Sequence, residues 1–156
     1  MSAVLVGRRR AAGFTLVELV VAISVAALLL ATAPAALDRL YDSMAYRATV
    51  RDVLSELKRA RNQARQSGEA VAFFVDLQAR QFGIDGEAGR SLPAQLEVHA
   101  QVAGRELGAD GRAAIRFYPD GGATGGSILI ERDNGEGVRL RVDWLLGRVS
   151  QEVLGG

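Results

Sequence analysis

The sequence contains no cysteine, and this absence excludes several classes of protein at once. Without a thiol there is no disulfide scaffold, no thiolate metal site and no cysteine catalysis. Histidine is almost absent as well, since His99 is the only one, and it lies in an alternating segment typical of a strand. With no second imidazole and no evident serine partner, His99 is expected to be structural. We therefore expect no catalytic residue, no metal site, no cofactor and no enzymatic activity.

An excess of charge of either sign is also missing. The chain of 156 residues carries 19 basic and 18 acidic side chains. From Asp38 onward there are 16 basic and 17 acidic residues, so the positive total comes from the N-terminal arm. Nucleic-acid-binding domains are usually basic, so a nucleic acid is not expected as a partner. With 49% apolar residues the chain can still build a core, which excludes a disordered protein.

Charge is missing altogether from one long stretch. The 19 residues from Leu19 to Leu37 are uncharged, and Arg8, Arg9 and Arg10 precede them. As a helix this run would be roughly 28 Å long, close to the roughly 30 Å of a bilayer core. It predicts a transmembrane helix half over residues 14–37. The arginines predict a single pass with the N-terminus in the cytoplasm and the rest of the chain exported.

Two other interpretations of this stretch compete with a membrane span. A cleaved secretory signal, even of the twin-arginine kind, is suggested by the arginines and by the small residues Ala31-Thr32-Ala33. A carboxylate at Glu18 would be costly in the apolar part of such a signal. The helical pattern also continues past the possible cleavage site. A buried helix of a soluble protein is the second alternative, although such helices rarely extend so far without a polar face.

Glycine and proline are absent between Ala35 and Ser67, and the pattern there is helical. Apolar residues recur at three- and four-residue steps, so residues 38–67 predict an amphipathic helix half that continues the first one. Gly68 stands where a helix end favours a left-handed residue. One helix of about 50 residues is expected. Its last turns are basic, and this charge suits the negative end of the helix dipole. We favour this interpretation of the basic residues over a nucleic-acid site.

After Gly68 the apolar period changes to two, which predicts a β domain over residues 68–156. Turn residues separate the expected strands, and Asn134-Gly135 between two alternating runs is a strong hairpin signal. Consecutive strands without intervening helices predict antiparallel sheets. The fold class is therefore α+β, a long N-terminal helix packed on an antiparallel sheet or sandwich. The expected strands are Val71–Val75, Gln81–Ile84, Leu96–Val102, Ala114–Tyr118, Ser127–Glu131 and Val138–Trp144.

The segment from Gly13 to Leu19 resembles the N-terminal signature of type IV pilins and of the pseudopilins of type II secretion systems. It combines a basic leader, Gly13, then Phe14, then Glu18 four positions later and a long apolar helix. The resemblance implies a pilin-like fold and cleavage between Gly13 and Phe14 by a prepilin peptidase, with N-methylation of Phe14. The leader, residues 1–13, would then be lost.

The same resemblance implies a role for Glu18 in assembly. A carboxylate in lipid needs a partner, and the positive N-terminus of a neighbouring subunit's Phe14 would be a suitable one. A second interpretation is that Glu18 reaches the cytoplasmic headgroups because it lies near the start of the helix. Both interpretations can hold at different stages of assembly.

The C-terminal half resembles the end of the GspH/FimT group of pilin-like proteins. The resemblance rests on residues 115–121, Gly125-Gly126, residues 142–145 and residues 147–149. It implies a minor pseudopilin in a periplasmic filament that promotes protein export. The implied partners are other major and minor pseudopilins, the prepilin peptidase and an inner-membrane assembly platform. The implied location is the bacterial inner membrane, with a periplasmic C-terminal domain. The alternative is a minor type IV pilin of the FimT or FimU kind, acting in pilus initiation or DNA uptake.

Two further features have simple interpretations. Residues 121–126 are glycine-rich but lack the Gly-Lys-Ser/Thr ending of a phosphate loop and precede a strand, so a turn that could contact a partner is expected. Trp144, the single tryptophan, is most simply a core or sheet-packing residue. A role for Trp144 at an interface is left open.

Overall fold

The structure is a computed structural model that describes residues 15–102 and 112–155, and it gives only the backbone for residues 31–40. The chain divides after Leu40 into two compact units. The first contains the start of a long helix. The second, Tyr41–Gly156, contains the rest of the helix and all the described strands.

A single helix of 52 residues, α1 (Leu16–Ser67), begins the described chain. Thr15 precedes it, and the Thr15 hydroxyl accepts a hydrogen bond from the backbone N–H of Glu18 at 3.2 Å. The helix ends at Gly68, which has a φ of 72° and donates its N–H to the carbonyl of Ala64 at 3.2 Å. The predicted helix of about 50 residues and its glycine end are thus confirmed. A left-handed residue is needed at this point, and glycine adopts that conformation without steric cost.

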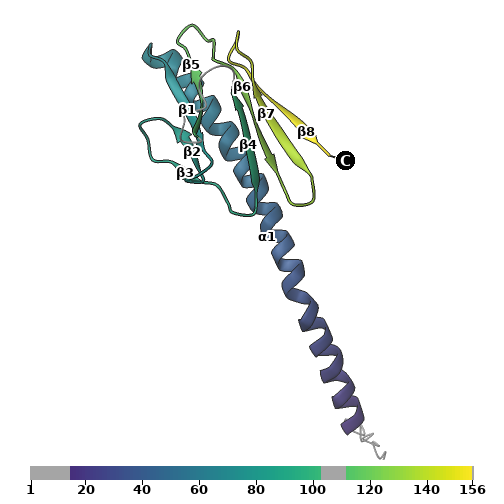
Figure 1. Cartoon of the computed structure of the whole chain (residues 1–156). Coiled ribbons are helices and arrows are strands. Elements are labelled where there is room, and N and C mark those ends of the chain that lie inside the picture. Colours follow the sequence, from purple (N-terminus) through teal and green to yellow (C-terminus); the bar gives the residue numbers. More distant parts are fainter. Residues whose placement is uncertain (1–14, 103–111, 156) are drawn as a thin grey trace, which may run out of the picture. The chain divides into compact units, whose positions relative to one another are not determined.

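Two antiparallel sheets of four strands each make up the rest of the second unit (Figure 1). The first has the order β3-β2-β1-β5 and the second the order β4-β6-β7-β8. Asn134-Gly135 forms the predicted β6–β7 hairpin, in which Gly126 pairs with Val142 and Glu131 with Gly137. The strands are β1 (Val71–Asp76), β2 (Gln81–Ile84), β3 (Arg90–Ser91), β4 (Glu97–Val102), β5 (Arg112–Phe117), β6 (Gly126–Glu131), β7 (Gly137–Val142) and β8 (Val149–Leu154).

The core of the second unit lies where α1 meets one face of each sheet. One stripe of α1 is buried at three- and four-residue steps, as expected for an amphipathic helix. The largest fully buried side chains are Phe73, Phe82 and Phe117, all from the first sheet. The second sheet contributes alternate residues of β6 and β7, as a half-buried antiparallel sheet should. The buried stripe of α1 is Val50, Val53, Leu57, Ala60 and Ala64, and the second sheet's core residues are Ile128, Ile130, Val138, Leu140 and Val142.

The α+β class and the antiparallel sheets are confirmed, but three details of the expected fold are wrong. Strands β3 and β8 were not expected, because β3 has only two residues and the middle of β8 is three consecutive polar residues, which break the alternating pattern. The last expected strand ends at Val142, so Trp144 is not a core residue: 67% of it is exposed. Tyr41 and Met44 lie at three- and four-residue steps in the predicted amphipathic half, residues 38–67, but they are also mostly exposed.

Candidate functional site

Glu18 lies in the first turn of α1, where its backbone is tied to Thr15. Besides the bond from Glu18 N–H to the Thr15 hydroxyl, the N–H of Leu19 donates to the carbonyl of Thr15 at 3.1 Å. Thr15 and Glu18 thus occupy the first and fourth positions of a capping box, and the acid suits the positive end of the helix dipole. This local role was not predicted, although the Thr-x-x-Glu spacing is visible in the sequence. The assembly role of Glu18 remains a prediction.

The first four turns of α1 expose large apolar side chains in nearly every position. Exposed fractions range from 79% at Leu16 to 52% at Val25, and Leu30 is 72% exposed. A helix that is apolar all round needs an apolar environment, because no polar face is left to meet water. The other exposed members are Val17, Leu19, Val20, Val21, Ile23, Leu28 and Leu29.

Within the described residues, no helix contains a stretch long and apolar enough to cross a membrane. The predicted membrane half, residues 14–37, includes Phe14 and residues 31–37, whose side chains lie outside the described part. The predicted cleavage site between Gly13 and Phe14 also lies outside the described residues. The predicted span and the predicted cleavage therefore both remain predictions.

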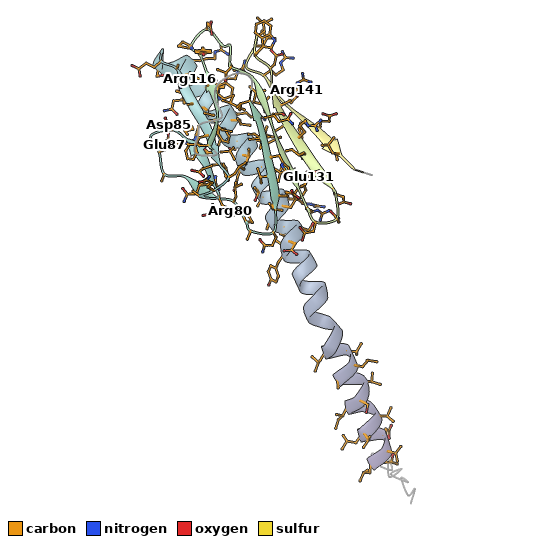
Figure 2. All side chains as sticks on the ribbon, viewed as in Figure 1. Arg80, Asp85, Glu87, Arg116, Glu131 and Arg141 are labelled. Carbon is orange, nitrogen blue, oxygen red and sulfur yellow. The ribbon has the colours of Figure 1, made fainter. Side chains whose placement is uncertain are left out.

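An ion-pair cluster joins α1 to strand β3 and to the loop that precedes it. Glu56 is almost buried, and its carboxylate pairs with Arg59 at 2.5 Å and with Arg90 at 3.7 Å. Arg90 also reaches Asp52 at 2.6 Å, while Arg59 reaches Glu87 at 2.7 Å. Figure 2 shows Glu87 and Asp85 beside the first sheet and Glu131 on the second sheet. The cluster thus fixes the helix against the edge of the first sheet.

Two pKa values depart from their ordinary range in this unit. Hydrogen bonds to Glu56 and then to Glu87 raise the pKa of the Arg59 guanidinium. Burial raises the pKa of the Tyr46 phenol, and the nearby charge of Arg132 opposes that shift. The Arg132 guanidinium lies 5.1 Å from the centre of the Tyr46 ring, a cation–π distance. Both shifts favour the protonation state that the groups have at neutral pH, so neither prepares a group for acid–base chemistry.

His99 projects from β4 toward two carboxylates. Its Nε2 lies 3.1 Å from Glu97 and 3.9 Å from Glu131, and its side chain is about half exposed, at 52%. Glu97 and Glu131 are direct partners across the β4–β6 pair. The contact of His99 with Glu97 accords with the structural role expected from the sequence. Among the described residues, no group of three or more His, Asp or Glu side chains is arranged to hold a metal ion.

The glycine-rich segment 121–126 connects the two sheets. The N–H of Tyr118 donates to the carbonyl of Gly122 at 2.9 Å, and the N–H of Ala123 donates to the carbonyl of Trp144 at 2.9 Å. Thr124 is bound twice to Arg116, through its N–H and through its hydroxyl. The segment is therefore a hydrogen-bonded turn, as its sequence predicted. It also positions the β7–β8 loop, which was not predicted.

Two family models match the chain, one on each side of residue 40. A model described as a prokaryotic N-terminal methylation motif matches residues 8–34. A model described as type II transport protein GspH matches residues 49–146, which includes the buried stripe of α1 and β1 to β7. The methylation motif and the family together indicate a membrane-anchored subunit.

The chain is similar to one protein in sequence and to another in three-dimensional structure. The chain is 34% identical over 145 residues to type II secretion system protein H of Xanthomonas campestris pv. campestris, covering 91% of this chain and 83% of that protein. The fold is similar to that of the minor pseudopilin EpsH from the type 2 secretion system of Vibrio cholerae. That match has a TM-score of 0.52 and 12% identity, and it covers 70% of this chain and 95% of EpsH. By its sequence, this chain belongs to the GspH family of type II transport proteins.

Proposed function

We propose that the chain is a minor pseudopilin, a structural subunit of the type II secretion pseudopilus. The observation that carries this proposal is the 34% identity to a type II secretion system protein H over 91% of the chain. At that coverage the relationship includes both the apolar start of the helix and the β domain. The subunit acts by assembly with other major and minor pseudopilins, and it has no enzymatic activity of its own.

The N-terminal segment supplies processing and anchoring in this proposal. A prepilin peptidase cuts between Gly13 and Phe14, and Phe14 is then N-methylated. The methylation motif over residues 8–34 supports this step. Three arginines before the apolar run support a single-pass orientation in the inner membrane, with the N-terminus in the cytoplasm and the C-terminal domain in the periplasm. The inner-membrane assembly platform would extract the helix from the membrane into the filament.

Glu18 is the residue we assign to assembly within the apolar segment. Its carboxylate lies one turn into α1, among side chains that are otherwise apolar. In lipid or in a filament core this charge must be paired, and the N-terminal amine of a neighbouring subunit's Phe14 is a partner of opposite charge. The capping bond to Thr15 uses only the backbone of Glu18, so the carboxylate remains available for that pairing.

The proposal is tested by deleting the gene in its host and measuring two processes side by side. Type II substrates should fall to background in the culture supernatant and accumulate in the periplasm, while pilus-dependent motility and DNA uptake stay unchanged. A plasmid copy of the gene should restore export. Normal export combined with a loss of piliation or of DNA uptake would contradict the proposal and would favour a minor type IV pilin instead.

A further inference from the structure

Three consecutive large apolar residues lie exposed in the β7–β8 loop. Trp144, Leu145 and Leu146, here called the ledge, are 67%, 62% and 51% exposed. Most large apolar residues of β1, β2, β5, β6 and β7 are instead buried in the core. A cluster of this kind on a folded surface calls for an explanation, because water contact with it is unfavourable.

Hydrogen bonds hold the ledge in one conformation. The Asp143 carboxylate accepts the N–H groups of Leu145 and Leu146, at 3.0 and 2.8 Å. The carbonyl of Trp144 accepts the N–H of Ala123 at 2.9 Å, and the carbonyl of Leu146 accepts a bond from Arg61 of α1 at 3.0 Å. The ledge is thus positioned before any partner arrives, which lowers the entropy lost on binding.

Gly147 ends the ledge at a point where no other residue fits. Its φ is 56°, and a Cβ there would lie 2.6 Å from the carbonyl oxygen of Gly121. Because glycine has no Cβ, the β7–β8 loop can lie close against the glycine-rich segment 121–126 at this point. The fold therefore keeps three apolar side chains exposed by a specific backbone arrangement and not by looseness.

A basic pocket of about 260 Å³ lies beside the ledge. Lys58, Arg61 and Arg148 line it together with Asn62 and Val149. Among the described residues, no acidic side chain pairs with any of these three cations. The Nε of Arg61 is buried and has no hydrogen-bond partner in this part of the chain. Arg61 belongs to both features, since it lines the pocket and binds the carbonyl of Leu146.

We propose that the ledge and the basic pocket form one docking surface for an acidic protein partner, namely a second pilin-like subunit. The inference rests on the proposed function for the identity of that partner. An apolar recess on the partner would receive Trp144 and Leu145, and carboxylates beside the recess would enter the pocket. A nucleic acid fits less well, because only one of the three ledge residues, Trp144, offers an aromatic face for base stacking and the chain from Asp38 onward has one more acidic than basic residue.

Site-specific photo-crosslinking of the full chain in its host tests this surface. A photoreactive phenylalanine analogue replaces Leu145 in one strain and Val153 in another; Val153 is a matched control because it is 72% exposed but lies on β8. Leu145 should crosslink to another pilin-like subunit at a peptide that neighbours aspartate or glutamate. The double variant Lys58→Glu, Arg148→Glu should lower the yield by about tenfold, as expected for loss of charge pairs at an interface. Arg61 is left unchanged because it supports the ledge.

The possible outcomes separate this inference from the proposed function. Crosslinks to nucleic acid, equal subunit crosslinks at Leu145 and Val153, or a yield unaffected by the double variant would overturn the docking surface. If the deletion strain loses export while Leu145 captures no subunit, the docking surface fails and the proposed function stands. If Leu145 captures a charge-dependent subunit but export is normal without the gene, the surface stands and the secretion role fails.

Discussion

The two described stretches of α1 differ in where their apolar residues lie. Between residues 16 and 30 the large apolar side chains are all exposed and occur on every side of the helix. Between residues 46 and 64 the buried apolar residues form one stripe, and charged residues such as Arg51 and Lys58 remain exposed. Backbone hydrogen bonding is the same in both, so the difference comes from the side chains alone.

This comparison separates two uses of one helix. The second stretch is stabilised by burial against the sheets of its own chain, so its environment is complete. The first stretch has no such cover among the described residues and requires lipid or other subunits. We therefore expect substitutions in the second stretch and in the core to change folding. Substitutions in the first should change membrane insertion or assembly.

The largest expected effect is on the core. Phe117→Ala removes a fully buried ring and should lower the free energy of unfolding of the second unit by about 3–5 kcal/mol. Leu19→Ala is the control, since Leu19 is 55% exposed, and it should leave that unfolding unchanged. Thermal unfolding of the full chain in detergent micelles measures both. A large effect of Leu19→Ala on the second unit would remove the distinction between the two stretches.

Glu18 comes next, and two substitutions test its charge apart from the size and polarity of its side chain. Glu18→Gln keeps a polar side chain of the same size but loses the charge, whereas Glu18→Ala loses both the charge and the polar side chain; the backbone bond to Thr15 is retained in each variant. If the charge pairs with a neighbouring amine, both variants should insert normally but lose about 1.5–3 kcal/mol of subunit association. Shearing and sedimentation of filaments measure incorporation. Normal incorporation of Glu18→Gln together with failure of Glu18→Ala would mean that a polar side chain is needed at this position and the charge is not.

The sequence predicted the parts of this structure that depend on local pattern. The length of α1, its end at Gly68 and the Asn134-Gly135 hairpin all follow from residues close together in the chain. The sequence pattern placed Trp144 at the end of a strand, because its neighbours Val142 and Leu145 continue an apolar run. The end of β7 is instead set by the contact of Ala123 with the Trp144 carbonyl, which joins distant segments.

The candidate sites also divide into those that a local pattern reveals and those formed by residues far apart in the sequence. Glu18 could be identified from its position in a recognisable motif, and its capping bond from the Thr-x-x-Glu spacing. The basic pocket could not be found, because Lys58 and Arg148 are 90 positions apart in the sequence and meet only in the folded chain. The pairing of Glu56 with Arg90 is hidden in the sequence for the same reason.

A smaller effect is expected from the ion-pair cluster that fixes the second stretch of α1. Glu56→Ala removes an almost buried carboxylate with two arginine partners and should cost about 1–2 kcal/mol of unfolding free energy. The matched control is Asp85→Ala, which removes the exposed pair with Arg112 and should cost less than about 1 kcal/mol. Urea unfolding at low and high salt measures both. Equal costs for the two variants would contradict the role assigned to burial.

The smallest expected effect is on alkaline stability. Burial raises the pKa of Tyr46 in the folded chain above its unfolded value of 10.0, so its contribution is fully present below pH 10 and is lost as the pH rises through the folded pKa. Tyr46→Phe should therefore lose less stability than the unaltered chain between pH 9 and pH 11. Unfolding at the two pH values measures this difference. An identical loss in both proteins would show that Tyr46 does not titrate differently on folding.

The central claim is that the apolar first stretch of α1 stays in the working protein and that only the leader is removed. Intact-mass and N-terminal peptide analysis of the chain purified from its host membranes tests this most directly. The account predicts a mature protein that begins with N-methylated Phe14. A mature N-terminus at Pro34 would show that a signal peptidase discards the apolar stretch, and it would contradict the account.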